Sequence, residues 1–238
     1  MKNFLYSVAL QWKLDIRSKS LLVTCYLVPL LFFLLMGGVF TSIMPEMKHT
    51  LIPAMIVMGV SMGALIGLPP SLAETYGSDI KKMYKANGVP ICLGLATMFV
   101  SAFLHLMMLC IILFLLAPIL FQASLPVNPP LFFLALALYM AVSLSIGSVL
   151  GLVVKSQAKL TMVSQLVFLP SILLSGIMFP MELLPKAFQV IGKLFPATWG
   201  NLLMQDNGFR LENLWYLILL FLVAVIVCGI LLKQQKSK

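Results

Sequence analysis

The chain has 238 residues, of which 61% are hydrophobic and only 10% are charged. Soluble domains carry about 45–50% apolar and about 25% charged residues. A water-soluble fold of this length could not bury so much apolar surface, so the composition excludes an ordinary soluble protein and favours a lipid environment.

The N-terminal segment Asn3–Lys19 has the pattern of an amphipathic helix. Apolar residues recur at steps of three and four, and charged residues take the other faces. We expect residues 1–20 to form an interfacial helix in the cytoplasmic membrane surface, and a frayed terminus is the alternative. The apolar face comprises Leu5, Val8, Trp12 and Ile16, and the charged residues are Lys13, Asp15, Arg17 and Lys19.

Six apolar stretches lack Asp, Glu, Lys and Arg and are long enough to cross a bilayer, which takes about 20 residues. In lipid each stretch has to satisfy its backbone groups internally, and none alternates in polarity as a barrel strand does. We therefore expect an all-α integral membrane protein with six transmembrane helices in one domain, residues 1–238. The expected spans are Leu21–Ile43, Leu51–Ala73, Ile91–Pro118, Leu131–Val154, Leu160–Phe179 and Asn213–Leu232.

Lys and Arg alternate between rich and poor segments outside these spans. Because short basic loops stay in the cytoplasm, both termini are expected inside. The net charge of +9 then reflects topology and some attraction to anionic lipids, not a nucleic-acid site. The basic set is Lys2, Lys13, Arg17, Lys19, Lys81, Lys82, Lys85, Lys155, Lys159, Lys233, Lys236 and Lys238, and the opposite set is Lys48, Lys186, Lys193 and Arg210.

Small residues on two spans predict close helix packing. Gly59, Gly63 and Gly67 form two overlapping GxxxG steps, and Gly147 and Gly151 form another. Packing within one chain is favoured over a subunit interface. We also expect helices to kink or end locally at prolines, namely Pro29, Pro69, Pro70 and Pro170.

The cytoplasmic loop from Glu74 to Pro90 contains the signals of a short helix. Ser78 is a good N-cap, Asp79 suits the positive helix end, and Gly88 followed by Pro90 predicts a stop. A two-turn helix is marginal alone, so its apolar face indicates a docking element. A solvated loop explains the lysines equally well but not the caps. The apolar face is Ile80, Met83 and Tyr84, opposite Lys81, Lys82 and Lys85.

The outer segment Ser175–Gln205 is divided by Pro180, Pro185 and Pro196. Broken backbone at membrane depth survives only if it is buried in protein or lines a cavity. We therefore expect a re-entrant hairpin over residues 180–205 that dips into the outer leaflet. Between the last two prolines a short amphipathic helix is expected, with Leu184, Phe188, Ile191 and Phe195 on its apolar face.

Catalytic signatures are missing from the sequence. The cysteines Cys25, Cys92, Cys110 and Cys228 fit apolar packing, and neither a disulfide nor a metal site is indicated. His105 lies inside a span, where a neutral His bonded to a neighbouring helix is favoured over a proton relay. No HExxH or Walker A motif is present. The chain is therefore passive, structural or powered by a partner.

Two groups of residues resemble the permease subunits of ATP-binding-cassette (ABC) exporters of the type 2 class, and the likeness covers nearly the whole chain. The first group is Ser175-Gly176, Leu184-Pro185, Pro196 and Gln205, and the second is Glu74, Gly77 and Val89-Pro90. The sequence departs from the family at Thr75, Ser78, Ala197 and Trp199, which affects the subfamily more than the family.

The resemblance implies a dimer of permease chains, the same or homologous, with two ABC ATPase subunits that bind ATP and Mg, while this chain binds no cofactor. The interfacial helix and the cytoplasmic loop would receive the ATPase motion through Glu74, Gly77, Ile80, Met83, Tyr84 and Pro90. The hairpin would shape the exit through Gly176, Pro180, Pro185, Phe188 and Pro196.

The expected function is export of a hydrophobic or amphipathic drug, peptide or lipid-like molecule from a bacterial cell, through its plasma membrane. Two alternatives stay open. One is a membrane-embedded enzyme, for which His105 would be the first catalytic candidate, and the other is an immunity or sensor protein that binds a peptide without moving it.

Overall fold

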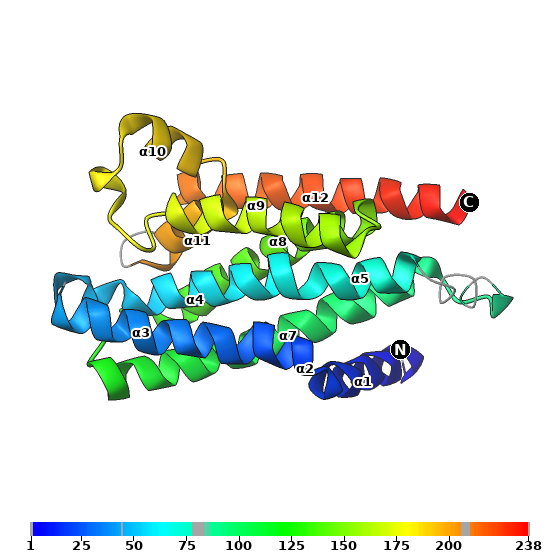
Figure 1. The fold of residues 1–238 in the computed structure, drawn as a ribbon, viewed down its shortest axis with the longest axis horizontal. Helices are drawn as coiled ribbons and strands as arrows, with labels where there is room; N and C mark the ends of the chain where they lie inside the picture. Colours follow the sequence, from blue (N-terminus) through cyan, green and yellow to red (C-terminus); the bar gives the residue numbers. More distant parts are fainter. Residues whose placement is uncertain (1, 44, 78–83, 85, 206–209, 238) are drawn as a thin grey trace.

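The computed structural model describes residues 2–43, 45–77, 84, 86–205 and 210–237, and the regular elements in these residues are helical. The fold class predicted from composition is confirmed in this respect. Five continuous helical runs are long and apolar enough to cross a membrane: Lys19–Ser42, Leu51–Gly77, Ile91–Phe121, Pro129–Val153 and Glu212–Gln234. Figure 1 shows these helices running side by side along the long axis of the molecule.

The N-terminal half consists of α1 (Lys2–Arg17), α2 (Lys19–Leu22), the π-helical turn η1 (Val23–Leu27), α3 (Val28–Ser42), η2 (Pro45–His49), α4 (Leu51–Met62), the π-helical turn η3 (Gly63–Gly67) and α5 (Leu68–Gly77). The C-terminal half consists of α7 (Ile91–Phe121), α8 (Pro129–Val153), α9 (Gln157–Leu173), η4 (Met181–Leu183), α10 (Lys186–Gly192), α11 (Pro196–Met204) and α12 (Leu211–Ser237).

The expected span Leu160–Phe179 is wrong at its C-terminal end, because α9 stops at Leu173. The next residues turn, with the Ser175 hydroxyl donating to the Ile172 carbonyl at 3.0 Å and Gly176 in a left-handed conformation at φ 77°. Such a backbone suits glycine and ends the helix. At 1.5 Å per residue, the 17 residues of α9 are about 25 Å long, somewhat less than the hydrocarbon core of a bilayer.

We expected helices to kink or end at the prolines. In the first two apolar runs the helices do not end there but continue past the prolines. Each run contains a π-helical turn that finishes two residues before its proline, at Leu27 before Pro29 and at Gly67 before Pro69. Proline lacks the N–H group and its ring presses on the carbonyl four residues earlier. A wider turn accommodates both effects, so the run Leu51–Gly77 continues past Pro69 and Pro70.

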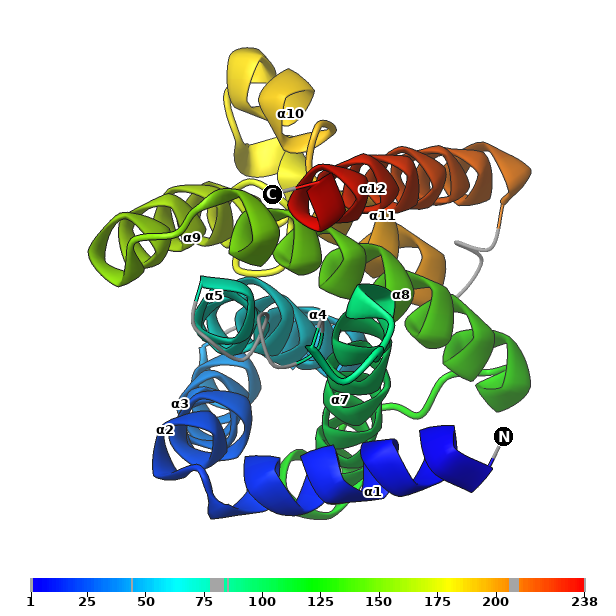
Figure 2. The same cartoon turned by 90° about the vertical axis from the view of Figure 1, so that its right-hand side faces the viewer.

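The run Leu51–Gly77 is the centre of the bundle. In its apolar 18-residue stretch 83% of the residues are buried, compared with 17% in the run Glu212–Gln234. On one side, a Cβ at Gly63 would overlap Leu106 of α7, and a Cβ at Gly67 would lie 3.0 Å from the Cys25 sulfur. On the other side, Gly147 of α8 faces the Ala64 carbonyl directly. Helices on both sides therefore approach the central one at glycines, and Figure 2 shows in end view that α7 and α8 flank α4 and α5.

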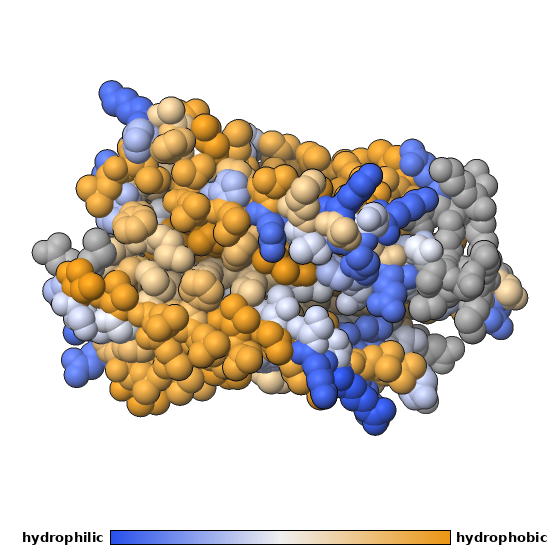
Figure 3. Space-filling view, in the orientation of Figure 1, coloured by the Kyte–Doolittle hydropathy of each residue, from blue (hydrophilic) through white to orange (hydrophobic). Residues whose placement is uncertain are grey.

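The connections fall at two ends of the bundle. Figure 1 places α1, the end of α5, the starts of α7 and α9, and the C-terminus at one end, and the α3–α4 connection and α10 at the other. In Figure 3 the apolar surface covers the helical runs, and hydrophilic side chains gather toward the end that carries α1. The described residues of the basic set, such as Lys13, Lys155 and Lys233, lie in α1, between α8 and α9 and near the end of α12, and therefore share this end.

We expect Gly147→Ala to destabilise the protein, because the added methyl group meets the fixed Ala64 backbone rather than a flexible side chain. Overpacking of this kind costs about 1–3 kcal/mol, which corresponds to a loss of roughly 5 °C in melting temperature for a chain of this size. Thermal unfolding of the detergent-solubilised chain measures it. Gly38→Ala in α3 is the matched control, since its Cβ would meet no atom within 4 Å, and an equal loss in both variants would contradict the packing argument.

Candidate coupling site

The junction between α5 and α7 carries the predicted coupling residues. Glu74 and Gly77 are exposed at the end of α5, and Pro90 is exposed immediately before α7. Of the remaining residues, Ile80 and Met83, with the predicted caps Ser78 and Asp79, lie outside the described residues. The stop predicted at Gly88 is present, since Gly88 is left-handed at φ 66° and the Val89 amide donates to the Tyr84 carbonyl at 2.9 Å.

Two tyrosines fasten this junction to the first turn of α7. The Tyr76 hydroxyl donates to the Ile91 carbonyl at 2.6 Å and accepts the Leu95 amide at 2.8 Å. The Tyr84 ring lies against Gly94, where a Cβ would come within 2.9 Å of it. Tyr84 therefore packs against its own chain, although the sequence placed it on a face that docks a partner. Tyr76 at the end of α5 and Tyr84 within the loop are thus both held against α7.

The inward face of α1 differs from the predicted apolar face. Val8 is buried and Trp12 is half-buried, as the pattern suggested, but Leu5 and Ile16 are exposed by 63% and 45%. Asp15, expected on a charged face, is only 7% exposed. The helix is rotated so that polar side chains enter the contact with α7, which shows that specific partners outweigh the hydrophobic pattern here.

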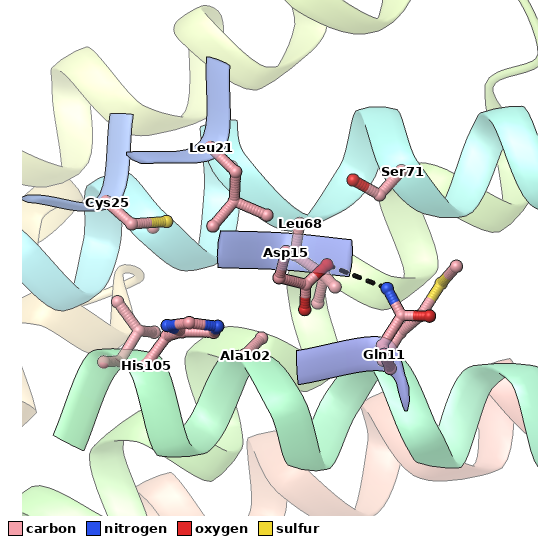
Figure 4. A pocket seen from close by; sticks show the side chains of 12 residues that line it. Gln11, Asp15, Leu21, Cys25, Leu68, Ser71, Ala102 and His105 are labelled. Carbon is pink, nitrogen blue, oxygen red and sulfur yellow. Dashed lines mark hydrogen bonds between the residues drawn. The ribbon is translucent and has the colours of Figure 1, made fainter. Parts of the chain in front are cut away.

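Polar contacts explain this rotation. The Asp15 carboxylate accepts hydrogen bonds from Ser101 at 2.5 Å and from Gln11 at 2.8 Å. The Trp12 ring stacks on the His105 ring, with centroids 3.9 Å apart and planes within 4°. His105 Nδ1 is 2.7 Å from the Tyr26 hydroxyl of η1, in keeping with a histidine bonded to a neighbouring helix. Figure 4 shows Gln11, Asp15 and His105 around one small pocket.

Sequence reasoning missed Asp15, Gln11 and Ser101 as members of this site. A signal was nevertheless present: Gln11 and Asp15 lie four residues apart on one helix, and Ser101 and His105 lie four residues apart on an otherwise apolar one. Side chains at this spacing share a helix face. Two polar pairs of equal spacing are what two helix faces in contact with each other would carry. The local sequence does not show, however, that these two helices meet.

The outer hairpin is built around its prolines. Pro180 precedes η4, Pro185 precedes α10, and Pro196 opens α11. Phe188 on α10 is 47% exposed and Ile191 is also exposed, whereas Leu184 and Phe195 are half-buried, so the predicted apolar face packs on the chain only at its two ends. By contrast, α11 is largely buried and contacts α8 and α12. One limb of the hairpin thus inserts into the bundle and the other stays outside it.

Hydrogen bonds fix the turn between these two limbs. Thr198 Oγ1 donates to the Gly192 carbonyl at 2.6 Å, and Trp199 Nε1 donates to the Lys193 carbonyl at 2.7 Å. Gly192 faces the Leu174 carbonyl so closely that a Cβ would overlap it. The Trp199 departure from the family pattern therefore has a local function, because its ring nitrogen satisfies a carbonyl at the end of α10.

Three residues of the first group that resembles the family line one open pocket at this end. Ser175, Gly176 and Gln205 meet there with Pro180, and the α3–α4 connection contributes Met47, His49 and Thr50. Glu182 and Asn201 add polar atoms to the wall. The structure thus brings Ser175, Gly176 and Gln205 together, whereas Leu184, Pro185 and Pro196 do not line this pocket. The predicted coupling residues Glu74 and Gly77 belong to the last turns of α5, which ends at the opposite end of the bundle (Figure 1).

Comparison with known proteins gives one match. The family model described as ABC-2 type transporter matches residues 2–209. The match runs from α1 through the outer hairpin and therefore includes both ends of the bundle. No curated protein and no solved structure matches the chain.

We expect Tyr76→Phe to loosen the α5–α7 junction without unfolding the chain, because it removes two hydrogen bonds and keeps the ring. Hydrogen bonds of this kind contribute about 1 kcal/mol each. Amide hydrogen exchange in residues 91–95 should accelerate by roughly tenfold or more, as measured by mass spectrometry in detergent. Tyr6→Phe, at an exposed position on α1, is the control, and unchanged exchange in Tyr76→Phe would show that the hydroxyl does not hold the junction.

Proposed function

This chain belongs to the ABC-2 type transporter family, and from that premise we propose that it is the permease subunit of an ABC exporter that moves a hydrophobic or amphipathic substrate outward. ATP and Mg are bound by a separate ABC ATPase, and this chain contributes neither a catalytic site nor a cofactor. The observation that carries the proposal is the α5–α7 junction, where the exposed end of α5 is bonded through Tyr76 to the first turns of α7.

The junction suits the transmission of motion from a partner. Glu74 and Gly77 are exposed and so can meet another protein, while Tyr76 beside them is bonded to the backbone of α7. A displacement of the exposed end of α5 by a partner would therefore be transmitted directly to α7 through the bonds of Tyr76. We assign the ATPase-facing role to Glu74, Gly77, Ile80, Met83 and Pro90, with Tyr84 as an internal fastening.

The outer hairpin suits a gate at the exit. Its buried limb α11 lies next to the central span and contacts α4, α8, α9 and α12. Gly176 provides the left-handed turn at its base, and the prolines interrupt its helices. Phe188 and its exposed apolar neighbours on α10 provide a surface for the outer leaflet or for the substrate.

We propose six crossings with both termini inside. Five helical runs have the length for it, and α9 completes the sixth together with the turn that leads into the hairpin. The described residues of the basic set lie at the end of the bundle that carries α1 (Figure 1), as the positive-inside rule requires of a cytoplasmic face. The chain is a multi-pass membrane protein, and we place it in a bacterial plasma membrane.

The functional unit in this proposal contains two permease chains, the same or homologous, and two ATPase subunits. A single permease leaves many large apolar side chains exposed on α3, α9 and α12. Lipid covers part of this surface, and a second permease covers the rest.

Affinity purification of the tagged chain from membranes in mild detergent tests the assembly. We expect an ABC ATPase to co-purify in equal stoichiometry, and inside-out vesicles that contain both chains should take up a fluorescent amphipathic cation when ATP is supplied. Co-purification of an intact, folded chain without any ATPase would contradict the transporter assignment. No ATP-dependent uptake of an amphipathic dye, an acylated peptide or a fluorescent phospholipid would contradict the substrate class.

We expect Glu74→Ala to lower ATP-dependent uptake at least about tenfold, with normal insertion of the chain. The reason is that truncation of a carboxylate in a charged contact between proteins costs about 2–5 kcal/mol. Vesicle uptake and the amount of bound ATPase are measured in parallel. Glu212→Ala, an exposed carboxylate at the start of α12 and at the opposite end of the bundle, should leave both unchanged, whereas full uptake by Glu74→Ala would remove Glu74 from the coupling site.

A further inference from the structure

Asp15 is unusual among the acidic residues of this chain. Glu74, Glu182 and Glu212 are exposed, whereas Asp15 is the one buried residue among the Asp and Glu side chains that the structure describes. Burial of a carboxylate is costly unless its oxygens accept hydrogen bonds. Here both do, one from Ser101 on α7 and one from Gln11 on α1 itself.

The neighbouring histidine has a second nitrogen that faces the same pocket. His105 is only 2% exposed, its Nδ1 is bonded to Tyr26, and its Nε2 has no partner within the part of the chain that the structure describes. The pocket is lined by Asp15, Gln11, Ser71 and Cys25 as well as by His105 (Figure 4). Its volume of about 20 Å³ holds one water molecule. His105 and Asp15 both line this space, so each offers a polar atom to a water there.

These contacts join three elements at one point. Asp15 and Trp12 come from α1, Ser101 and His105 from α7, and Tyr26 from η1, at the start of the first membrane-spanning run. Apolar contacts would also attach α1, but they tolerate sliding and rotation. Hydrogen bonds to a charged group are directional and about twice as strong as neutral ones, so they fix the register of α1 on α7.

We propose that Asp15 is a positioning residue for transport, which clamps α1 to α7 through Ser101 and, across one water, through His105. Movement of α1 by the ATPase then displaces α7 together with it, instead of sliding along it. The part that concerns movement rests on the proposed function, whereas the clamp itself does not.

Cys25 provides a native reporter of the clamp, since it lines the same pocket and is buried. The probe is N-ethylmaleimide, applied to native membranes, with modification of the Cys25 peptide quantified by mass spectrometry. We expect Asp15→Ala to accelerate Cys25 labelling at least about tenfold, because a hydrogen-bonded charged group holds α1 closed. Ser101→Ala and His105→Phe, which keeps a ring against Trp12, should each give several-fold acceleration.

Lys13→Ala, at an exposed position on the same helix, is the matched control and should label at the wild-type rate. Equal labelling in wild type and in the folded Asp15→Ala variant would overturn the clamp. If Asp15→Ala does not insert, Asp15→Asn keeps the shape and removes the charge, and the same comparison applies to it. Equal labelling of His105→Phe and wild type would overturn the assignment of His105.

The coupling part is tested on the purified complex with its ATPase. We expect ATP with vanadate to change the Cys25 labelling rate of the wild type at least about threefold, and to leave the rate of Asp15→Asn unchanged even though the ATPase stays bound. A nucleotide response of the same size in both would overturn the positioning role, since a merely structural residue would not affect it. Absence of an ATPase would defeat the proposed function, while the comparison in membranes would still decide the clamp.

Discussion

Lipid offers no hydrogen-bond partner to a backbone N–H or C=O group, so each crossing segment has to pair these groups within itself. In this chain the constraint reaches the prolines, which would leave a gap in an ordinary helix. The π-helical turns η1 and η3 precede Pro29 and Pro69 and absorb the missing bond and the bulk of the ring, so that the runs Lys19–Ser42 and Leu51–Gly77 continue. Lipid does not solvate charged groups either, so the charged side chains that the structure describes lie toward the two ends of the bundle.

Because apolar side chains gain little from leaving lipid for one another, close packing has to hold the crossing helices together. The central run shows how this is achieved. Gly63 admits Leu106 from α7, and Gly147 lets α8 approach the Ala64 carbonyl from the other side. The buried Tyr139 of α8 then bonds to Ser61 at 2.6 Å, next to the same contact. Small residues bring the backbones close, and one polar pair fixes their register.

Local sequence features predict the parts of this fold that depend on the chain itself. Length and apolarity identify the helices, and Gly88 and the three hairpin prolines mark element ends that the structure also has. The partners could not be predicted, since Ser101 lies 86 residues from Asp15 and His105 lies 79 residues from Tyr26. The apolar pattern of Leu5, Val8, Trp12 and Ile16 therefore did not predict the rotation of α1. Tyr84 was likewise expected to contact a partner, although it packs on Gly94. The early end of α9 depends on the left-handed turn at Gly176, which apolarity alone does not indicate.

The two faces of α1 differ in kind, one exposed and apolar and the other polar and directed at the bundle. Its outward side carries exposed apolar residues, Leu10 and Leu14 among them, which suit the membrane surface. Its inward side meets the bundle through Asp15, Gln11 and Trp12 rather than through a purely apolar stripe. Attraction to lipid alone would let the helix drift in the plane of the membrane. A directional contact to α7 gives it one position, and a helix with one position can pass a displacement on to the span that it touches.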